Sequence, residues 1–212
     1  MQSAATVPSL GTSDAENQVF PAGCHPGQTG GWMVYVAFLR GINVGGKTIV
    51  SMAAIKEALV DLGLSDVRTY INSGNVIFST RASDTQKLGA RIEKALEERT
   101  GMPIMVLITD HKGLKKLVDA IPRNWVDDKT MRTYVLLLWK ELDDGTILER
   151  LPVRPGVDNL RYAPGAVIWQ VDRKDIAKSR MSRIIGTPYY KRITIRSVNT
   201  IRKLNELTAG PA

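Results

Sequence analysis

Two β-rich runs separated by only two residues constrain the fold of this chain more than any other feature. The runs cover residues 66–72 and 75–80, and Ser73 and Gly74 lie between them. A short gap that contains glycine, between two such runs, is typical of a β-hairpin. Because strands joined by a hairpin are antiparallel, a purely parallel sheet with crossover helices is excluded for this part of the chain.

Helix and strand patterns on both sides of the hairpin complete a larger unit. Residues 33–39 and 103–109 are short apolar runs of the kind that form buried strands. Apolar residues recur at helical spacing over 52–62 and again over 88–96. The predicted order is therefore β-α-β-β-α-β, which is the ferredoxin-like unit.

Polar residues at the expected helix starts support this division. Ser51 precedes the first helix as an N-cap, and Ser83 with Gln86 forms a capping box for the second. Asp110 is placed to cap a further helix that begins near His111.

The same order of elements recurs in the second part of the chain. The expected elements are a linking helix over 114–121, strands at 130–139, 159–162, 166–171 and 192–195, helices at 144–151 and 175–185, and a final helix capped by Ser197. We infer a tandem duplication. The prediction is an α+β fold of two tandem ferredoxin-like (βαββαβ) subdomains, residues 33–110 and 111–209, with a linking helix and a C-terminal helix. A disordered N-terminal tail, residues 1–32, precedes them.

Composition excludes several classes of protein. A chain of 212 residues with 43% hydrophobic residues is sufficient for one large or two small packed domains. No apolar run approaches the roughly 20 residues that span a bilayer, so neither a transmembrane segment nor a membrane partner is expected. The single cysteine, Cys24, excludes an internal disulfide and fits a cytoplasmic location. With only two histidines, His25 and His111, no metal site and no cofactor are expected.

The stretch Arg40-Gly41-Ile42-Asn43-Val44-Gly45-Gly46-Lys47-Thr48 follows the first strand and is rich in glycine. Glycines allow main-chain N–H groups to converge, and a cation at each end favours an anion. The stretch also matches the P-loop pattern GxxxxGK[ST]. However, three β-branched residues, 48–50, follow Lys47, so a helix is not expected to begin there as it does in a P-loop. A P-loop NTPase is therefore the less favoured hypothesis.

In the ferredoxin-like plan this loop and the turn at 72–75 open on the same edge of the sheet. Together they give a candidate ligand-binding site, which consists of Arg40, Gly41, Asn43, Gly45, Gly46, Lys47, Asn72, Ser73, Gly74 and Asn75. The plainer alternative is that the glycines and asparagines only form tight turns. The pairs Asp127-Asp128 and Asp143-Asp144 are interpreted as turn and cap residues, so the catalytic residues are unknown.

Positive charge is concentrated near the C-terminus. Between Arg173 and Lys203 there are ten basic residues and one acid, a net charge of +9 in a chain whose total is +8. The predicted basic patch consists of Lys178, Arg180, Arg183, Lys191, Arg192, Arg196 and Lys203. Such a segment is typical of a surface that meets a polyanion or a phosphate, and the alternative is a merely solvated basic face.

Three motifs resemble those of one family. FLRGINVGGK, VRTYINSGNVIF and SRMSRIIGTPYYKRITIRSVNTIRKL are similar to the motif regions of domain of unknown function 1697 (DUF1697), an uncharacterised and mainly bacterial family. The resemblance covers about residues 33–207. It implies two α+β subdomains related to the ferredoxin-like plan, a cytoplasmic location and no agreed activity. The family offers no established catalytic residues to transfer.

Three functional hypotheses follow. The first is a non-catalytic protein that binds nucleic acid or a phosphorylated small molecule through the RGINVGGK loop and the basic segment, with Tyr189 and Tyr190 available for base stacking. The second is an enzyme that acts on a small phosphorylated metabolite. The third is a protein-interaction module whose basic face meets an acidic partner.

Overall fold

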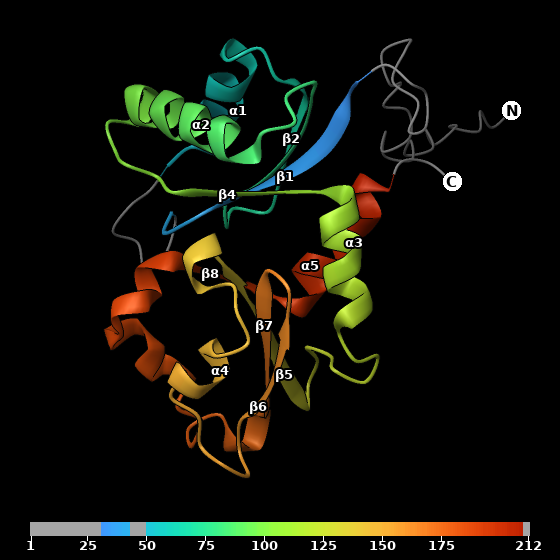
Figure 1. The fold of residues 1–212 in the computed structure, drawn as a ribbon, viewed down its shortest axis with the longest axis vertical. Coiled ribbons are helices and arrows are strands. Elements are labelled where there is room, and N and C mark those ends of the chain that lie inside the picture. The colour runs from blue at the N-terminus through green and yellow to red at the C-terminus, as the bar shows by residue number, and fades with distance from the viewer. Residues whose placement is uncertain (1–30, 43–49, 210–212) are drawn as a thin grey trace, which may run out of the picture.

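The computed structural model describes residues 31–42 and 50–209, and their fold is α+β. It contains two four-stranded sheets, in which every strand pair is antiparallel. Helices lie against both sheets, and the two sheets occupy the upper and lower parts of Figure 1. The predicted tail, residues 1–32, lies outside the described residues except for its last two. None of the described helices is long and apolar enough to cross a membrane.

The first half contains the predicted order of elements. In chain order these are β1 (Met33–Leu39), α1 (Met52–Asp61), β2 (Ser65–Tyr70), β3 (Asn75–Thr80), α2 (Thr85–Thr100) and β4 (Val106–Asp110). The sheet order is β2-β3-β1-β4. The hairpin prediction is confirmed, since Tyr70 pairs with Asn75. An antiparallel sheet with a helix that begins only at Met52 is not the P-loop architecture, so the described residues contradict that hypothesis.

Most of the predicted helix caps are confirmed. The Ser51 side chain accepts a hydrogen bond from Ala54 N at 3.4 Å, and Asp110 accepts one from Gly113 N at 2.7 Å. The predicted capping box at Ser83 is wrong. Asp84 is the N-cap of α2, because its carboxylate accepts from two successive main-chain N–H groups.

The second half repeats the sheet with less regular connections. Its elements are α3 (His111–Ala120), β5 (Met131–Leu138), η1 (Lys140–Leu142), α4 (Ile147–Arg150), β6 (Asn159–Ala163), β7 (Ala166–Asp172), η2 (Arg173–Asp175), η3 (Met181–Gly186), η4 (Pro188–Arg192), β8 (Ile193–Ser197) and α5 (Val198–Thr208), where η marks a 3₁₀ helix. The sheet order is β6-β7-β5-β8, which matches that of the first half.

The α-helix predicted at 175–185 is wrong, because this stretch contains the end of η2, a turn, an irregular pair of residues and most of the 3₁₀ helix η3. The Arg180 N–H donates to the Asp158 carboxylate at 3.1 Å, and the Met181 N–H donates to Ser179 Oγ at 3.1 Å. Both main-chain donors are therefore taken by side chains instead of by the carbonyls of a preceding helical turn.

Three buried clusters hold the layers together. The first lies between the outer face of the first sheet and helices α1 and α2, and Ile55 and Leu88 belong to it. The third covers the outer face of the second sheet with α4, η3 and η4. The middle cluster takes Phe38 from β1, Val135 from β5, and apolar residues of α3 and α5. The two halves therefore share a core, and their separation into domains at 110/111 stays a prediction.

Candidate functional site

Arg196 of β8 lies at the contact between the two halves. It is only 8% exposed. Its Nε donates to Asn75 Oδ1 at 2.6 Å, and its Nη2 donates to the carbonyls of Leu39 and Gly74 at 2.8 and 3.2 Å. Its Nη1 donates within its own strand, to Thr194 Oγ1 and the Ile195 carbonyl. A guanidinium has five N–H donors, so all of them are engaged.

Arg40, just after β1, makes the reverse contact. Its Nε donates to the Ile193 carbonyl and its Nη2 to the Tyr190 carbonyl, each at 3.1 Å. The guanidinium also lies over the ring of Tyr190, 4.9 Å from the ring centroid. One arginine of each half thus donates hydrogen bonds to main-chain carbonyls of the other half. We call this pair of contacts the arginine junction.

Burial changes the electrostatics of the junction. Desolvation lowers the pKa of Arg196 to about 10, which leaves the guanidinium charged at neutral pH. Its partners among the described residues are neutral oxygens, and no carboxylate lies within ion-pair distance of it. The positive charge is therefore stabilised by carbonyl dipoles, which a buried cation requires when it has no counterion.

The predicted turn residues serve the same junction. Asn75 is fully buried, donates to the Tyr70 carbonyl and to Ser73 Oγ, and accepts from Arg196. Gly74 has φ +75, and a Cβ on it would lie 2.9 Å from the Cβ of Leu39. Asn72 and Ser73 are exposed in the turn.

The structure thus brings Arg40, Gly74, Asn75 and Arg196 together, but their polar groups contact one another and the main chain. Gly41 is exposed next to Arg40. The remaining predicted members, Asn43, Gly45, Gly46 and Lys47, lie outside the described residues. Arg196 is buried, so it does not belong to an exposed basic patch as predicted.

The other cations of the predicted patch are exposed. Lys178 pairs with Asp175 at 2.7 Å, and Arg192 approaches Glu141 at 3.6 Å. Lys203 of α5 pairs with Glu206 at 2.9 Å, which raises the pKa of the lysine. Three cations have no acidic partner among the described residues, and we call the surface that they form with Lys178 the basic surface. The three are Arg180, Arg183 and Lys191.

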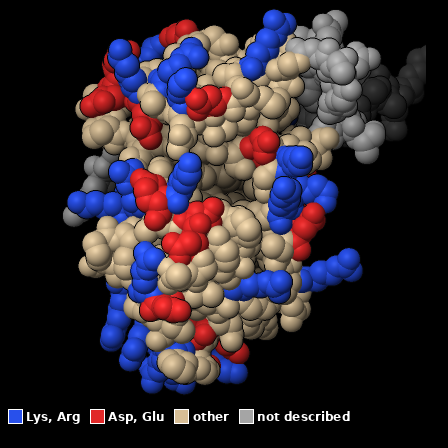
Figure 2. Space-filling model, in the orientation of Figure 1, with Lys and Arg blue, Asp and Glu red and all other residues tan. Residues whose placement is uncertain are grey.

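The basic surface covers the 3₁₀ segments of the second half. In Figure 2 basic side chains gather along the left side and the foot of this half, and in Figure 1 the orange-red segment that follows β7 lies on that left side. No acidic residue occurs between Ile176 and Asn205 in the sequence, so the local charge is not balanced along the chain.

A buried carboxylate fixes the backbone beneath the basic surface. Asp158 is 7% exposed and accepts from the main-chain N–H groups of Arg154 at 2.8 Å and Arg180 at 3.1 Å. It also accepts from Ser179 Oγ and from Trp169 Nε1. Burial alone would raise the pKa of Asp158, but these four donors outweigh it and hold the pKa below its usual value.

The two tyrosines proposed for stacking are engaged within the protein. The Tyr189 hydroxyl donates to the Arg150 carbonyl, and the Tyr190 ring lies beneath the Arg40 guanidinium. Both rings pack against the outer core of the second sheet and are only partly exposed. They do not form a free platform for bases.

A cleft of about 930 Å³ lies between the two halves. One wall consists of α2 and the outer edge of β4, and includes Gln86 and Glu93. The other wall includes Lys140, Glu141 and Arg192. Figure 2 shows a hollow at the waist of the molecule with acidic and basic side chains beside it. No local pattern in the sequence indicates this cleft, because its walls come from segments about fifty residues apart.

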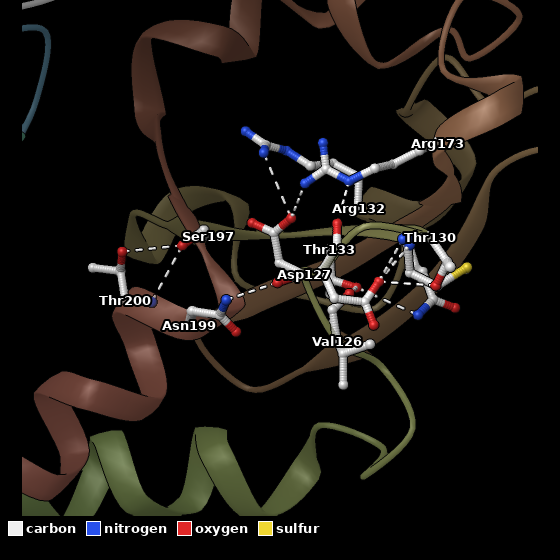
Figure 3. Close-up of polar contacts among 12 residues, drawn as sticks. Val126, Asp127, Thr130, Arg132, Thr133, Arg173, Ser197, Asn199 and Thr200 are labelled. Carbon is white, nitrogen blue, oxygen red and sulfur yellow. Dashed lines mark hydrogen bonds and ion pairs between the residues drawn. The ribbon is translucent and has the colours of Figure 1, made fainter.

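A charged cluster joins the linker before β5 to the second sheet. Figure 3 shows the guanidinium groups of Arg132 and Arg173 both directed toward the Asp127 carboxylate, at 3.5 and 2.8 Å. Asn199, at the start of α5, donates to the Asp127 carbonyl at 2.8 Å. Asp127 was expected to be a turn residue, and the structure shows an ion-pair centre that joins the nearby Arg132 and the more distant Arg173. Asp128 is the turn residue, since it accepts from Thr130 and Met131.

Comparison with known proteins assigns the chain to a family. The family model described as protein of unknown function (DUF1697) matches residues 33–169. The chain belongs to the DUF1697 family. A search of the curated proteins finds no match. Among solved structures, the conserved bacterial protein SP0830 from Streptococcus pneumoniae is similar, with 26% sequence identity and a TM-score of 0.72. The similarity covers 84% of this chain and 99% of that one, so it extends over both halves of this DUF1697 protein.

Proposed function

We propose that this DUF1697 protein binds an anionic ligand through the basic surface. The observation that carries the proposal is that Arg180, Arg183 and Lys191 are exposed without an acidic partner among the described residues. A group of unpaired cations attracts anions and raises the local concentration of those anions.

An extended polyanion fits this surface better than a small metabolite does. The exposed cations lie in or beside the short 3₁₀ helices η3 and η4, whereas small-molecule sites are concave and enclose most of the ligand. Nucleic acid is one such polyanion, and its phosphates would supply the contacts without base recognition.

The proposal is tested by fluorescence anisotropy with mixed-sequence single-stranded DNA and RNA over a range of salt concentrations. We expect log affinity to fall linearly with log salt concentration. The triple variant Arg180→Ala, Arg183→Ala, Lys191→Ala should flatten that slope by about 2, because each lost contact contributes about 0.7 on single strands.

A matched control removes three exposed lysines from α1 and α3 instead. Lys56→Ala, Lys112→Ala and Lys116→Ala reduce the net charge equally but leave the basic surface intact. Equal weakening by both triple variants would show that only total charge matters. Absence of binding at low salt would reject nucleic acid as the anionic ligand of this surface.

A second candidate function is an enzyme that acts on a small phosphorylated metabolite. The cleft favours it, since its volume suits a small ligand and Arg192 and Lys140 offer positive charge beside Glu141 and Glu93. A thermal-shift panel of nucleotides and sugar phosphates should then raise the melting temperature. The same panel should have no effect on Arg192→Ala. If no compound stabilises the wild-type protein, this candidate is rejected.

We also propose that each half follows the ferredoxin-like plan and that the halves descend from a duplication. Two pairs of equivalent hydrogen bonds support this. Leu39 N donates to the Gly74 carbonyl at 2.8 Å, as Leu138 N does to the Gly165 carbonyl at 2.9 Å. Arg40 N donates to the Met105 carbonyl as Trp139 N does to that of Arg192. A cytoplasmic location is likewise a proposal.

A further inference from the structure

Two isoleucines project from the segment that carries the basic surface. Ile185 is 63% exposed and Ile176 is 45% exposed. The 3₁₀ helix η3 repeats every three residues, so the inward side of Met181 and Ile184 recurs while Arg183 and Ile185 face outward. Two exposed aliphatic side chains are therefore interspersed with exposed cations along 176–191.

These isoleucines do not suit a nucleic acid. Proteins that bind single strands place aromatic rings or guanidinium planes against the bases. Here the rings of Tyr189 and Tyr190 are held by Arg150 and Arg40, and the exposed apolar groups are aliphatic. The free energy of an aliphatic side chain falls when its apolar surface is transferred from water into hydrocarbon.

We infer that the basic surface docks on an anionic lipid bilayer, with Ile176 and Ile185 inserted at the headgroup boundary. The inference rests on the proposed function and names its ligand. Cations flanking exposed apolar side chains are the combination that binds proteins to the face of an anionic membrane. The cations contact the lipid phosphates, and the two isoleucines bury their apolar surface in the hydrocarbon. The sugar-phosphate backbone of a nucleic acid offers no such apolar environment.

The inference departs from the expectation that the chain has no membrane partner. That expectation rested on the absence of a spanning segment. Surface docking requires no such segment, but only a few exposed side chains whose position the sequence does not reveal.

Co-sedimentation of the full chain with vesicles of phosphatidylcholine, with and without phosphatidylglycerol, tests the inference. We expect binding only when phosphatidylglycerol is present, and its loss at high salt. The double variant Ile176→Ser, Ile185→Ser should weaken vesicle binding about tenfold or more, because each isoleucine loses a transfer into hydrocarbon. The same variant should bind single-stranded DNA as the wild type does.

Val60→Ser with Ile71→Ser is the matched control, since both residues are 50% exposed and lie outside the basic surface. This control should bind vesicles normally. Binding to DNA but not to vesicles would overturn the inference and leave the proposed function intact. Vesicle binding that is insensitive to Ile176→Ser, Ile185→Ser would overturn the insertion of these side chains. Failure to bind either DNA or vesicles would refute both proposals.

Discussion

At the scale of single residues, Arg196 is the side chain on which the contact between the halves depends most. Replacing it with lysine keeps the charge but leaves three N–H donors in place of five, so some of the five acceptors of Arg196 lose their partner. Because stranded buried acceptors cost about 1–3 kcal/mol each, we expect Arg196→Lys to lower the free energy of unfolding by about 3 kcal/mol. Urea denaturation measures this. The exposed control Arg180→Lys should change it by less than about 0.5 kcal/mol, and equal effects would contradict the prediction.

Asp158 gives a residue-scale prediction that depends on pH. Because the pKa of Asp158 is lowered in the folded state, the carboxylate stabilises the fold above the unfolded pKa of about 3.9. That stabilisation disappears as the pH falls through the folded pKa. Asp158→Asn should therefore lower the free energy of unfolding by about 2 kcal/mol near neutral pH. The asparagine amide replaces one accepting oxygen with an NH2 group, which cannot accept the hydrogen bonds that main-chain N–H groups donate to Asp158. Thermal melts should show this gap closing in acid. A gap that is the same at about pH 3 and about pH 7 would exclude the charged form as its cause.

At the scale of elements, the two hairpin turns provide an internal comparison. Gly74 and Gly165 both have positive φ, +75 and +86. A Cβ on Gly74 would collide with Leu39 and Ile42, whereas a Cβ on Gly165 would meet nothing within 4 Å. Gly165→Ala should cost about 1–2 kcal/mol, the strain of a left-handed residue. Gly74→Ala should cost about 1–3 kcal/mol more through overpacking, as measured by chemical denaturation. Equal losses would show that the turn beside Gly74 can relax.

The sequence predicted elements well where the deciding interactions are local. Helix α1 and its Ser51 cap, and the β2–β3 hairpin, follow from spacing and turn chemistry within a few residues. The failure at 175–185 has a distant cause, because the Asp158 carboxylate takes the Arg180 N–H from 22 positions away. The roles of Arg40 and Arg196 were likewise hidden, since their acceptors are about 150 residues distant and are carbonyls that no side-chain pattern marks.

At the scale of the whole molecule, the shared middle core predicts one unfolding transition. Phe38 and Val135 belong to the same buried cluster, so neither sheet keeps its inner face covered if the other unfolds. Three of the four tryptophans, at 125, 139 and 169, report on the second half, while far-UV circular dichroism also reports on helices α1 and α2. The two denaturation midpoints should coincide. Separate midpoints would show that the halves unfold independently.

The arginine junction also bears on how such a chain tolerates mutation. A salt bridge between a basic and an acidic side chain is lost when either residue is substituted, so both positions must be retained or must change together. A main-chain carbonyl is present whatever side chain the residue carries. The positions that supply most of the acceptors of Arg40 and Arg196 can therefore change their side chains without loss of these hydrogen bonds. Two arginines can thus hold the same arrangement through extensive divergence of the residues around them.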